Sequence, residues 1–261
     1  MQTQPQEFAP PPIGGPSPTP ERKLLAPVWH TIVFVLIVLA NSYSTAVSLP
    51  KVAANASPRG RIFGYVFTIG WELVLLLIVW LGIRSRGVVK MKELIGGRWQ
   101  SPEDFLIDIG IALGFWLVAL AVLASLGYLL GLAKAAQAGE AKKLAEMLGP
   151  QSPVALAMFV LLSSVAGFIE EIIFRGYLQR QFGALTGNIY LGLILSAIVF
   201  GLGHGYEGLR RMVLIAVFGM LFGLLTIWRR SLRPAMMAHA WHDSVSGIVL
   251  YLVKKGAIPM P

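Results

Sequence analysis

The chain contains no cysteine among its 261 residues, and charged residues make up only 13% of it. Without cysteine there is no disulfide framework, no cysteine-ligated metal and no cysteine nucleophile. Histidine is also rare, with four in the whole chain. Hydrophobic residues reach 56% and the mean hydropathy is +0.68, which is too apolar for a soluble globular domain. We therefore predict an integral membrane protein whose chemistry depends on serine, histidine and carboxylates.

A net charge of +9 could indicate a nucleic-acid ligand, but the basic residues stand at the ends of apolar segments. This placement is typical of membrane flanks. It predicts contact with membrane lipids and no nucleic-acid partner. The loop at 84–104 contains five Lys or Arg residues and favours a cytoplasmic N-terminus.

Seven apolar segments approach or exceed the roughly 20 residues that a membrane-spanning helix needs. They lie at residues 28–49, 62–83, 105–132, 153–179, 188–204, 212–228 and 235–253. The pattern predicts an all-α, polytopic transmembrane bundle of about seven to eight membrane helices.

The chain divides into four predicted regions. Residues 1–27 hold eight of the sixteen prolines and are predicted to be a disordered tail. Three membrane helices follow within 28–132, and the mixed charge of 133–152 predicts an extramembrane or interfacial helix. The helix bundle at 153–253 contains the candidate functional residues.

Ionisable residues interrupt the fourth apolar segment. No charged residue occurs at 153–169, and then Glu170, Glu171 and Arg175 follow within six positions. Charged groups inside a membrane need partners and usually mark a functional site. Glu171 and Arg175 are four apart and share a helix face, so they can pair, whereas Glu170 points elsewhere and stays available for chemistry.

Three of the four histidines come after this glutamate pair. His204 ends a glycine-containing stretch of the fifth segment. His239 and Asp243 are four apart and share one face of the last segment, whereas His242 points elsewhere. Polar groups on three apolar helices can be satisfied only in the bundle interior, so we expect them to converge there.

Three further polar residues in the apolar segments, His30, Glu72 and Asp108, have no partner that the sequence reveals. We interpret them as interfacial or water-facing and assign them no part in the site.

The converging residues fit the activation of a water molecule. Glu170 could act as a general base toward a water that His204 helps to hold. His239 and the residue at position 243 could donate hydrogen bonds to a developing oxyanion. We therefore predict a hydrolase site without metal or other cofactor, in a tilted or broken part of the bundle whose cavity opens to the cytoplasmic side.

Three motifs occur in order on the fourth, fifth and seventh apolar segments: Glu-Glu-x-x-x-Arg, Phe-x-x-x-His and His-x-x-x-Asp. Together they resemble the CPBP family, the CAAX-processing and bacteriocin-processing (ABI) intramembrane proteases, which includes the type II CAAX prenyl endopeptidases. The resemblance covers roughly residues 153–250. It implies hydrolysis of a peptide bond in a membrane-associated peptide or protein substrate, and a location in a bacterial plasma membrane.

The resemblance also implies a role for each residue of the first two motifs. Glu170 would activate the attacking water, with His204 beside it. Glu171 and Arg175 would form a structural pair that orients the site. From the residues themselves, we interpret Phe200, the first residue of the second motif, as a wall of the substrate pocket.

In the third motif, the resemblance implies that His239 and Asp243 face the scissile carbonyl. The prenyl-protease branch has Asn at position 243, and Asn brings a neutral N–H donor, whereas an ionised Asp can only accept. Asp243 must therefore be protonated, or orient His239 or another donor, or the protein must do something other than cut prenylated CAAX substrates.

Other functions stay open at this point. Two His with Glu or Asp could hold Zn²⁺ in a membrane metalloprotease, although the His-Glu-x-x-His signature is absent. Glu and His could relay protons in a transporter, although no internal repeat is visible. The chain could also be a non-catalytic membrane scaffold or immunity factor that keeps the polar cluster without cutting.

Overall fold

The computed structural model describes residues 23–54, 57–132, 134 and 139–258. These residues form helices and connecting turns, and no strand occurs among them. The longer helices are α1 (Val28–Ala54), α2 (Pro58–Arg86), α4 (Pro102–Leu129), α7 (Pro153–Glu170), α9 (Ile189–Gly203), α10 (Leu209–Arg229) and α11 (Arg233–Lys254). The shorter elements are α3 (Met91–Ile95), α6 (Glu140–Leu148), the π-helix η1 (Glu171–Leu178), α8 (Gln179–Thr186) and the 3-10 turn η2 (Gly205–Glu207).

Five helical stretches are long and apolar enough to cross a membrane: Val28–Lys51, Arg59–Arg86, Pro102–Leu129, Pro153–Thr186 and Leu209–Arg229. The all-α class and the multi-pass membrane protein predicted from the sequence are thereby confirmed. The predicted number of seven to eight membrane helices is not. All seven apolar segments are helical, but α9 has 15 residues, about 22 Å of helix against a hydrocarbon core of about 30 Å. The polar residues of α11 keep it outside the five.

Three long helices begin with the same dipeptide, Ser-Pro. The hydroxyls of Ser57, Ser101 and Ser152 each accept a hydrogen bond from the backbone N–H three residues later. Proline at the first helical position gives up an N–H that would have no partner there. The starts of α2, α4 and α7 are therefore set by local sequence.

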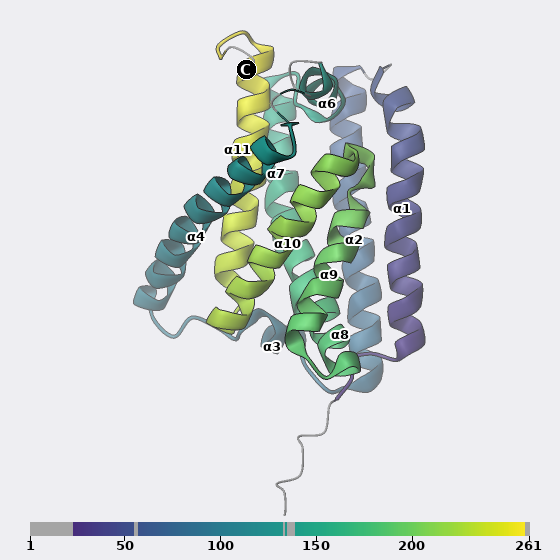
Figure 1. Cartoon of the computed structure of the whole chain (residues 1–261), viewed down its shortest axis with the longest axis vertical. Helices are drawn as coiled ribbons and strands as arrows, with labels where there is room; N and C mark the ends of the chain where they lie inside the picture. The colour runs from purple at the N-terminus through teal and green to yellow at the C-terminus, as the bar shows by residue number, and fades with distance from the viewer. Residues whose placement is uncertain (1–22, 55–56, 133, 135–138, 259–261) are drawn as a thin grey trace, which may run out of the picture.

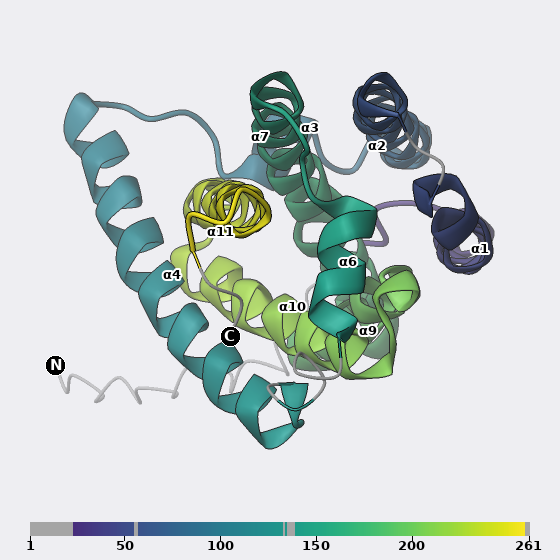
Figure 2. The same cartoon turned by 90° about the horizontal axis from the view of Figure 1, so that it is seen from above.

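The helix α7 and its continuation η1 run through the middle of the bundle. Figure 2 shows α1 and α2 on one side of α7 and α11 on the other. In the same view, α9 and α10 lie below α7. In Figure 1, α4 is inclined relative to α1 and α2, and it packs against α11 and α10. The most extensive packing joins α7 to α11, which brings the predicted glutamate and histidine segments together.

Glycines allow the helices around the site to approach closely. A Cβ at Gly167 of α7 would lie 2.6 Å from the backbone nitrogen of Ala240 in α11. A Cβ at Gly201 of α9 would lie 2.7 Å from the carbonyl oxygen of Met212 in α10. Since backbone atoms cannot move aside as a flexible side chain can, both contacts require glycine. The first holds α7 against α11 one turn from the glutamate pair.

The end of the predicted tail is packed into the bundle. Leu25 and Ala26 are buried, and their backbone N–H groups lie 2.8 and 3.2 Å from Oε1 of Gln181. Residues 1–22 lie outside the described residues. The boundary of the predicted tail at residue 27 therefore differs from the structure, in which the chain is already held against α8 at Leu25.

His30 is buried between helices, and its predicted position at the membrane interface stays a prediction. Its Nδ1 lies 3.1 Å from the Tyr177 hydroxyl of η1, and its Nε2 lies 3.0 Å from the carbonyl oxygen of Ile78 in α2. Thr31 makes a second hydrogen bond to the Tyr177 hydroxyl at 2.9 Å. These contacts fasten the start of α1 to the π-helix.

The predicted interfacial helix at 133–152 is helical over α6, while residues 133 and 135–138 lie outside the described residues. The end of α6 is fastened to α2, because Arg61 donates to the carbonyl oxygens of Glu146 and Met147, and Tyr65 donates to that of Leu148. Its position outside the hydrocarbon core stays a prediction.

Candidate active site

The candidate site begins where α7 loses α-helical geometry. From Glu171 to Leu178 the backbone forms a π-helix, and all eight of its residues are buried. Such wide turns are rare and are frequently found at functional sites. Within it, Arg175 Nη1 lies 2.8 Å from Glu171 Oε1. The pair predicted from the four-residue spacing is thus present, and both side chains are out of contact with solvent.

Glu171 has a second partner that the sequence did not reveal. Its Oε1 also accepts a hydrogen bond from Nδ1 of His239 at 2.9 Å. A carboxylate on Nδ1 sets the orientation of an imidazole ring and assigns the Nδ1 proton. Arg175, Glu171 and His239 therefore form a buried chain that directs Nε2 of His239 toward the rest of the site.

Two carboxylates face that Nε2. Glu170 Oε2 and Asp243 Oδ2 each lie 3.6 Å from it, beyond the range of a direct hydrogen bond but close enough for their charges to interact. Their side chains are 14% and 35% exposed, whereas Glu171 is fully buried. Glu170 and Asp243 can therefore meet water or substrate, and Glu171 cannot.

Aromatic rings surround the buried part of the site. The rings of Phe218 and Phe222 lie 5.0 and 5.6 Å from that of His239, and the guanidinium of Arg175 lies 4.4 Å from the ring centre of Phe200. Phe200 is 2% exposed. Its role as a wall of the substrate pocket stays a prediction, while its packing against Arg175 is observed.

His204 ends α9 and begins the turn η2. Its Nδ1 lies 2.9 Å from the carbonyl oxygen of Phe200. Ser42 of α1 holds this turn in place, because its hydroxyl donates to the carbonyl oxygen of Leu202 at 2.7 Å and accepts from Gly205 N–H at 3.1 Å. The ring of His204 lies 4.9 Å from that of Phe200, which in turn lies 6.1 Å from the ring of His239, so the turn borders the site. The predicted position of His204 beside Glu170 stays a prediction.

Sequence reasoning missed three groups near Glu170. Glu72 of α2, together with Tyr206 and Glu207 of η2, interacts electrostatically with Glu170. Glu72 is 8% exposed, and its Oε2 has no hydrogen-bond partner among the described residues. Its interpretation as interfacial or water-facing is therefore wrong. Nothing local in the sequence signals how α2 is rotated against α7, although position 206 could have been noted for standing two residues from His204.

Burial also acts on Glu207, which lies outside the membrane-spanning helices. Burial raises the pKa of the Glu207 carboxyl, and the nearby charges of His204 and Arg211 partly oppose that rise. The side of the site formed by η2 therefore contains a buried carboxyl group, and the charges of His204 and Arg211 oppose part of the effect of its burial.

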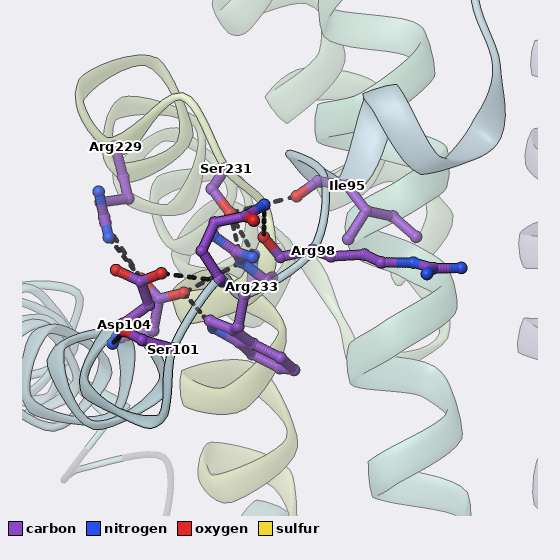
Figure 3. Close-up of polar contacts among 10 residues, drawn as sticks. Ile95, Arg98, Ser101, Asp104, Arg229, Ser231 and Arg233 are labelled. Carbon is purple, nitrogen blue, oxygen red and sulfur yellow. Dashed lines mark hydrogen bonds and ion pairs between the residues drawn. The ribbon is translucent and has the colours of Figure 1, made fainter.

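The start of α11 is fastened by a carboxylate of α4. Figure 3 shows Arg229, at the end of α10, and Arg233, at the start of α11. Both arginines form ion pairs with one carboxylate of α4. This group is Asp108, which lies 3.0 Å from Nε of each arginine and accepts from Trp99 Nε1 at 2.8 Å. Asp108 is fully buried and does not face water, so its interpretation as water-facing is wrong, while its interfacial position stays a prediction. The network sets the position of the helix in which His239 follows six residues after Arg233.

No group of three or more His, Asp or Glu residues suited to hold a metal ion occurs within the described ranges. An apolar pocket of about 270 Å³ is lined by Leu73, Leu76, Leu77, Trp80 and Met91, none of which belongs to the site. The catalytic cavity opening to the cytoplasmic side stays a prediction.

The fold and the site define a multi-pass, all-helical membrane protein with a Glu–His–Asp cluster in its interior. Residues 152–245 match the family model described as Rce1-like, type II CAAX prenyl endopeptidase Rce1-like. The matched segment runs from the N-cap of α7 into α11 and contains all the predicted site residues. The match confirms the resemblance to the CAAX protease family over this segment and supports a CAAX-type membrane protease at the level of the family. No curated protein and no solved structure matches the chain.

Proposed function

We propose that this chain is an intramembrane endopeptidase that hydrolyses a peptide bond with a water molecule activated by Glu170. The observation that supports it most is the arrangement around His239, with Nδ1 held by the buried Glu171 and Nε2 facing the partly exposed Glu170 and Asp243. A structural ion-pair network would not need two accessible carboxylates around one imidazole nitrogen.

Each group then has a step in the reaction. Glu170 accepts a proton from water as the water oxygen adds to the scissile carbonyl, and this proton is later passed to the leaving amine. In its protonated form His239 donates from both ring nitrogens, through Nδ1 to Glu171 and through Nε2 to the oxygen that becomes negative. Arg175 and Glu171 position His239 and do not touch the substrate.

The substrate class follows from the location of the site and from the family that matches. A cluster inside a helical membrane protein meets peptides that are themselves associated with the membrane, either CAAX-type or other membrane-associated segments. A bacterial plasma membrane is the proposed location, as the motif resemblance implies.

A purified assay with a matched pair of variants tests the catalytic base. Glu170→Gln keeps the size of the side chain but removes the base, so turnover of a peptide with a farnesylated cysteine near its C-terminus should fall by about 10² or more. Glu103→Gln, on the exposed start of α4, should leave turnover unchanged. Near-normal turnover by Glu170→Gln would contradict the assignment of Glu170 as the base.

The substrate itself can be sought in cells. Membrane fractions from cells that express wild type should contain truncated peptides that are missing from cells with Glu170→Ala. Identical peptide profiles, together with no cleavage by the purified wild type, would favour the scaffold or immunity function instead.

A further inference from the structure

A groove between α2 and α3 lies outside the candidate active site. It encloses about 270 Å³ and is lined by Leu73, Leu76, Leu77, Trp80 and Met91. The first four of these residues belong to a helical stretch that is long and apolar enough to cross a membrane, Arg59–Arg86. Leu73 and Leu77 are 53% and 52% exposed, so the groove is open toward the surrounding lipid. An apolar groove in a membrane-spanning helix fits a hydrocarbon chain.

Arg84 stands one turn beyond Trp80 on the same side of α2 as the groove, since residues three or four apart share a helix face. Its guanidinium carbon lies 5.0 Å from the centre of the Trp80 ring. This cation–π contact fixes a positive charge at the end of the groove. The side chain of Arg84 is exposed, and among the described residues it makes no ion pair or hydrogen bond. The guanidinium is therefore open to an anion.

The surroundings of Arg84 are also basic. Arg86 ends α2, and Lys92 lies in α3, whose first residue lines the groove. Both side chains are exposed. The one carboxylate between residues 84 and 95 belongs to Glu93, which accepts a hydrogen bond from the backbone N–H of Lys90 at 3.1 Å. A complementary ligand therefore combines a hydrocarbon chain with a negatively charged group.

The inner wall of the groove packs against elements that hold the candidate active site. Leu76 and Met91 contact a buried cluster formed by Ile172, Leu232 and Met236. Ile172 belongs to the π-helix η1, and the other two residues stand at the start of α11. A ligand that contacts both Leu76 and Met91 joins α2 to α3 over this cluster and should stabilise the fold.

We infer that the groove binds one anionic phospholipid of the cytoplasmic leaflet, with an acyl chain against Leu76 and Met91 and the phosphate at Arg84. The basic loop at 84–104 favours the cytoplasmic side for this end of the bundle, where anionic lipids attract Lys and Arg. A guanidinium can donate two parallel hydrogen bonds to a phosphate. A soluble phosphate would meet Arg84 but leave the apolar walls unfilled. The inference does not depend on the proposed peptidase function.

Native mass spectrometry of the purified full chain tests recognition of the headgroup. Wild type is given equal amounts of phosphatidylglycerol and phosphatidylcholine with the same acyl chains, and it should retain the anionic lipid preferentially. Arg84→Gln should lower the ratio of retained phosphatidylglycerol to phosphatidylcholine by about fivefold, the equivalent of about 1 kcal/mol per basic residue near a membrane surface. Arg59→Gln removes the same charge from the exposed opposite end of α2 and should leave the ratio unchanged. Equal retention of the two lipids by wild type, or the same fall in both variants, would overturn the inference.

Larger side chains test whether the acyl chain lies in the groove. Met91→Trp fills the groove from α3, and Leu77→Trp narrows it from an exposed position of α2 that a larger ring does not force into the core. Both variants should retain less phosphatidylglycerol than wild type. Val66→Trp, on an exposed part of α2 outside the groove, should retain as much as wild type. Undiminished retention by Leu77→Trp and Met91→Trp would contradict binding in the groove.

Thermal unfolding gives a second measurement. A ligand that binds only the folded state raises Tm, so phosphatidylglycerol should raise the Tm of wild type more than phosphatidylcholine does. This additional rise should be absent in Arg84→Gln and present in Arg59→Gln. Inorganic phosphate at the same concentration should not raise Tm, because it cannot fill the groove. A rise with phosphate as large as that with phosphatidylglycerol would indicate a simple anion site and overturn the assignment of a lipid.

Discussion

Glu171 makes two contacts through one oxygen atom, and only one of them follows from local sequence. The ion pair with Arg175 depends on a spacing of four residues within a single helical segment. The hydrogen bond to His239 depends on how α7 packs against α11. A residue predicted to be a structural partner of Arg175 therefore also sets the orientation of the imidazole in the site.

The two contacts of Glu171 should affect different properties. The ion pair with Arg175 should affect the stability of the fold, and the hydrogen bond to His239 should affect activity. Arg175→Ala leaves the buried Glu171 carboxylate without its cation, a change that typically costs about 3–5 kcal/mol. Replacing both residues with leucine removes the unpaired charge, so folded yield in detergent should be higher for this double variant than for Arg175→Ala. Activity should not return, because Nδ1 of His239 has lost its acceptor. Size-exclusion profiles, thermal unfolding and turnover measure the two effects.

Arg86→Ala, at the exposed end of α2, is the control for loss of a positive charge and should match wild type in all three measurements. If the leucine double variant gave as little folded protein as Arg175→Ala, the pair would not behave as a buried ion pair. If that double variant were fully active, Glu171 would have no role in orienting His239.

At the scale of helices, the site depends on two departures from regular α-geometry and on one close contact. Glu171 and Arg175 lie in the π-helix, His204 directly precedes the 3-10 turn, and Tyr206 lies within that turn. The sequence predicted a broken or tilted part of the bundle, but neither kind of turn has a distinctive local pattern. The contact at Gly167 then brings α7 and α11 together.

Gly167→Ala should disturb the site without touching any of its polar residues. A new Cβ would lie 2.6 Å from Ala240 N, so α7 and α11 must move apart. We expect destabilisation of about 1–3 kcal/mol from overpacking and a loss of turnover of about 10², as for misplacements of 1 Å near reacting groups. Thermal unfolding and peptide turnover give the two values.

Gly114→Ala provides the matched control, because its Cβ would meet nothing within 4 Å in the middle of α4. This variant should be as stable as wild type or slightly more so, since alanine favours helix. Activity of Gly167→Ala equal to that of Gly114→Ala would mean that the α7–α11 contact does not position the site.

Across the whole molecule, sequence reasoning succeeded where the signal is local and failed where a partner is distant. Long apolar runs predicted every long helix, because membrane burial imposes a composition on each segment separately. The burial of His30 and Asp108 was missed because their partners are 147 and 121 residues away. Glu72 and Tyr206 were missed for the same reason, since their position near Glu170 exists only after the helices have packed.

The orientation of the bundle in the membrane can be predicted from the basic loop at 84–104. Figure 1 places α3, in the basic loop at 84–104, and α6 at opposite ends of the molecule. Because positive loops stay in the cytoplasm, the end with α3 should be cytoplasmic. The absence of cysteine makes this testable, since a single introduced cysteine is the only thiol in the chain.

In spheroplasts, a membrane-impermeant maleimide should label Glu146→Cys, on the exposed side of α6, and should label Lys92→Cys only after the membrane is opened. Leu117→Cys, on the exposed apolar face of α4, should stay unlabelled in both conditions, because a charged reagent does not enter the hydrocarbon core. The reverse pattern at positions 92 and 146 would place α3 outside the cell. It would also contradict the cytoplasmic N-terminus that the basic loop at 84–104 favours.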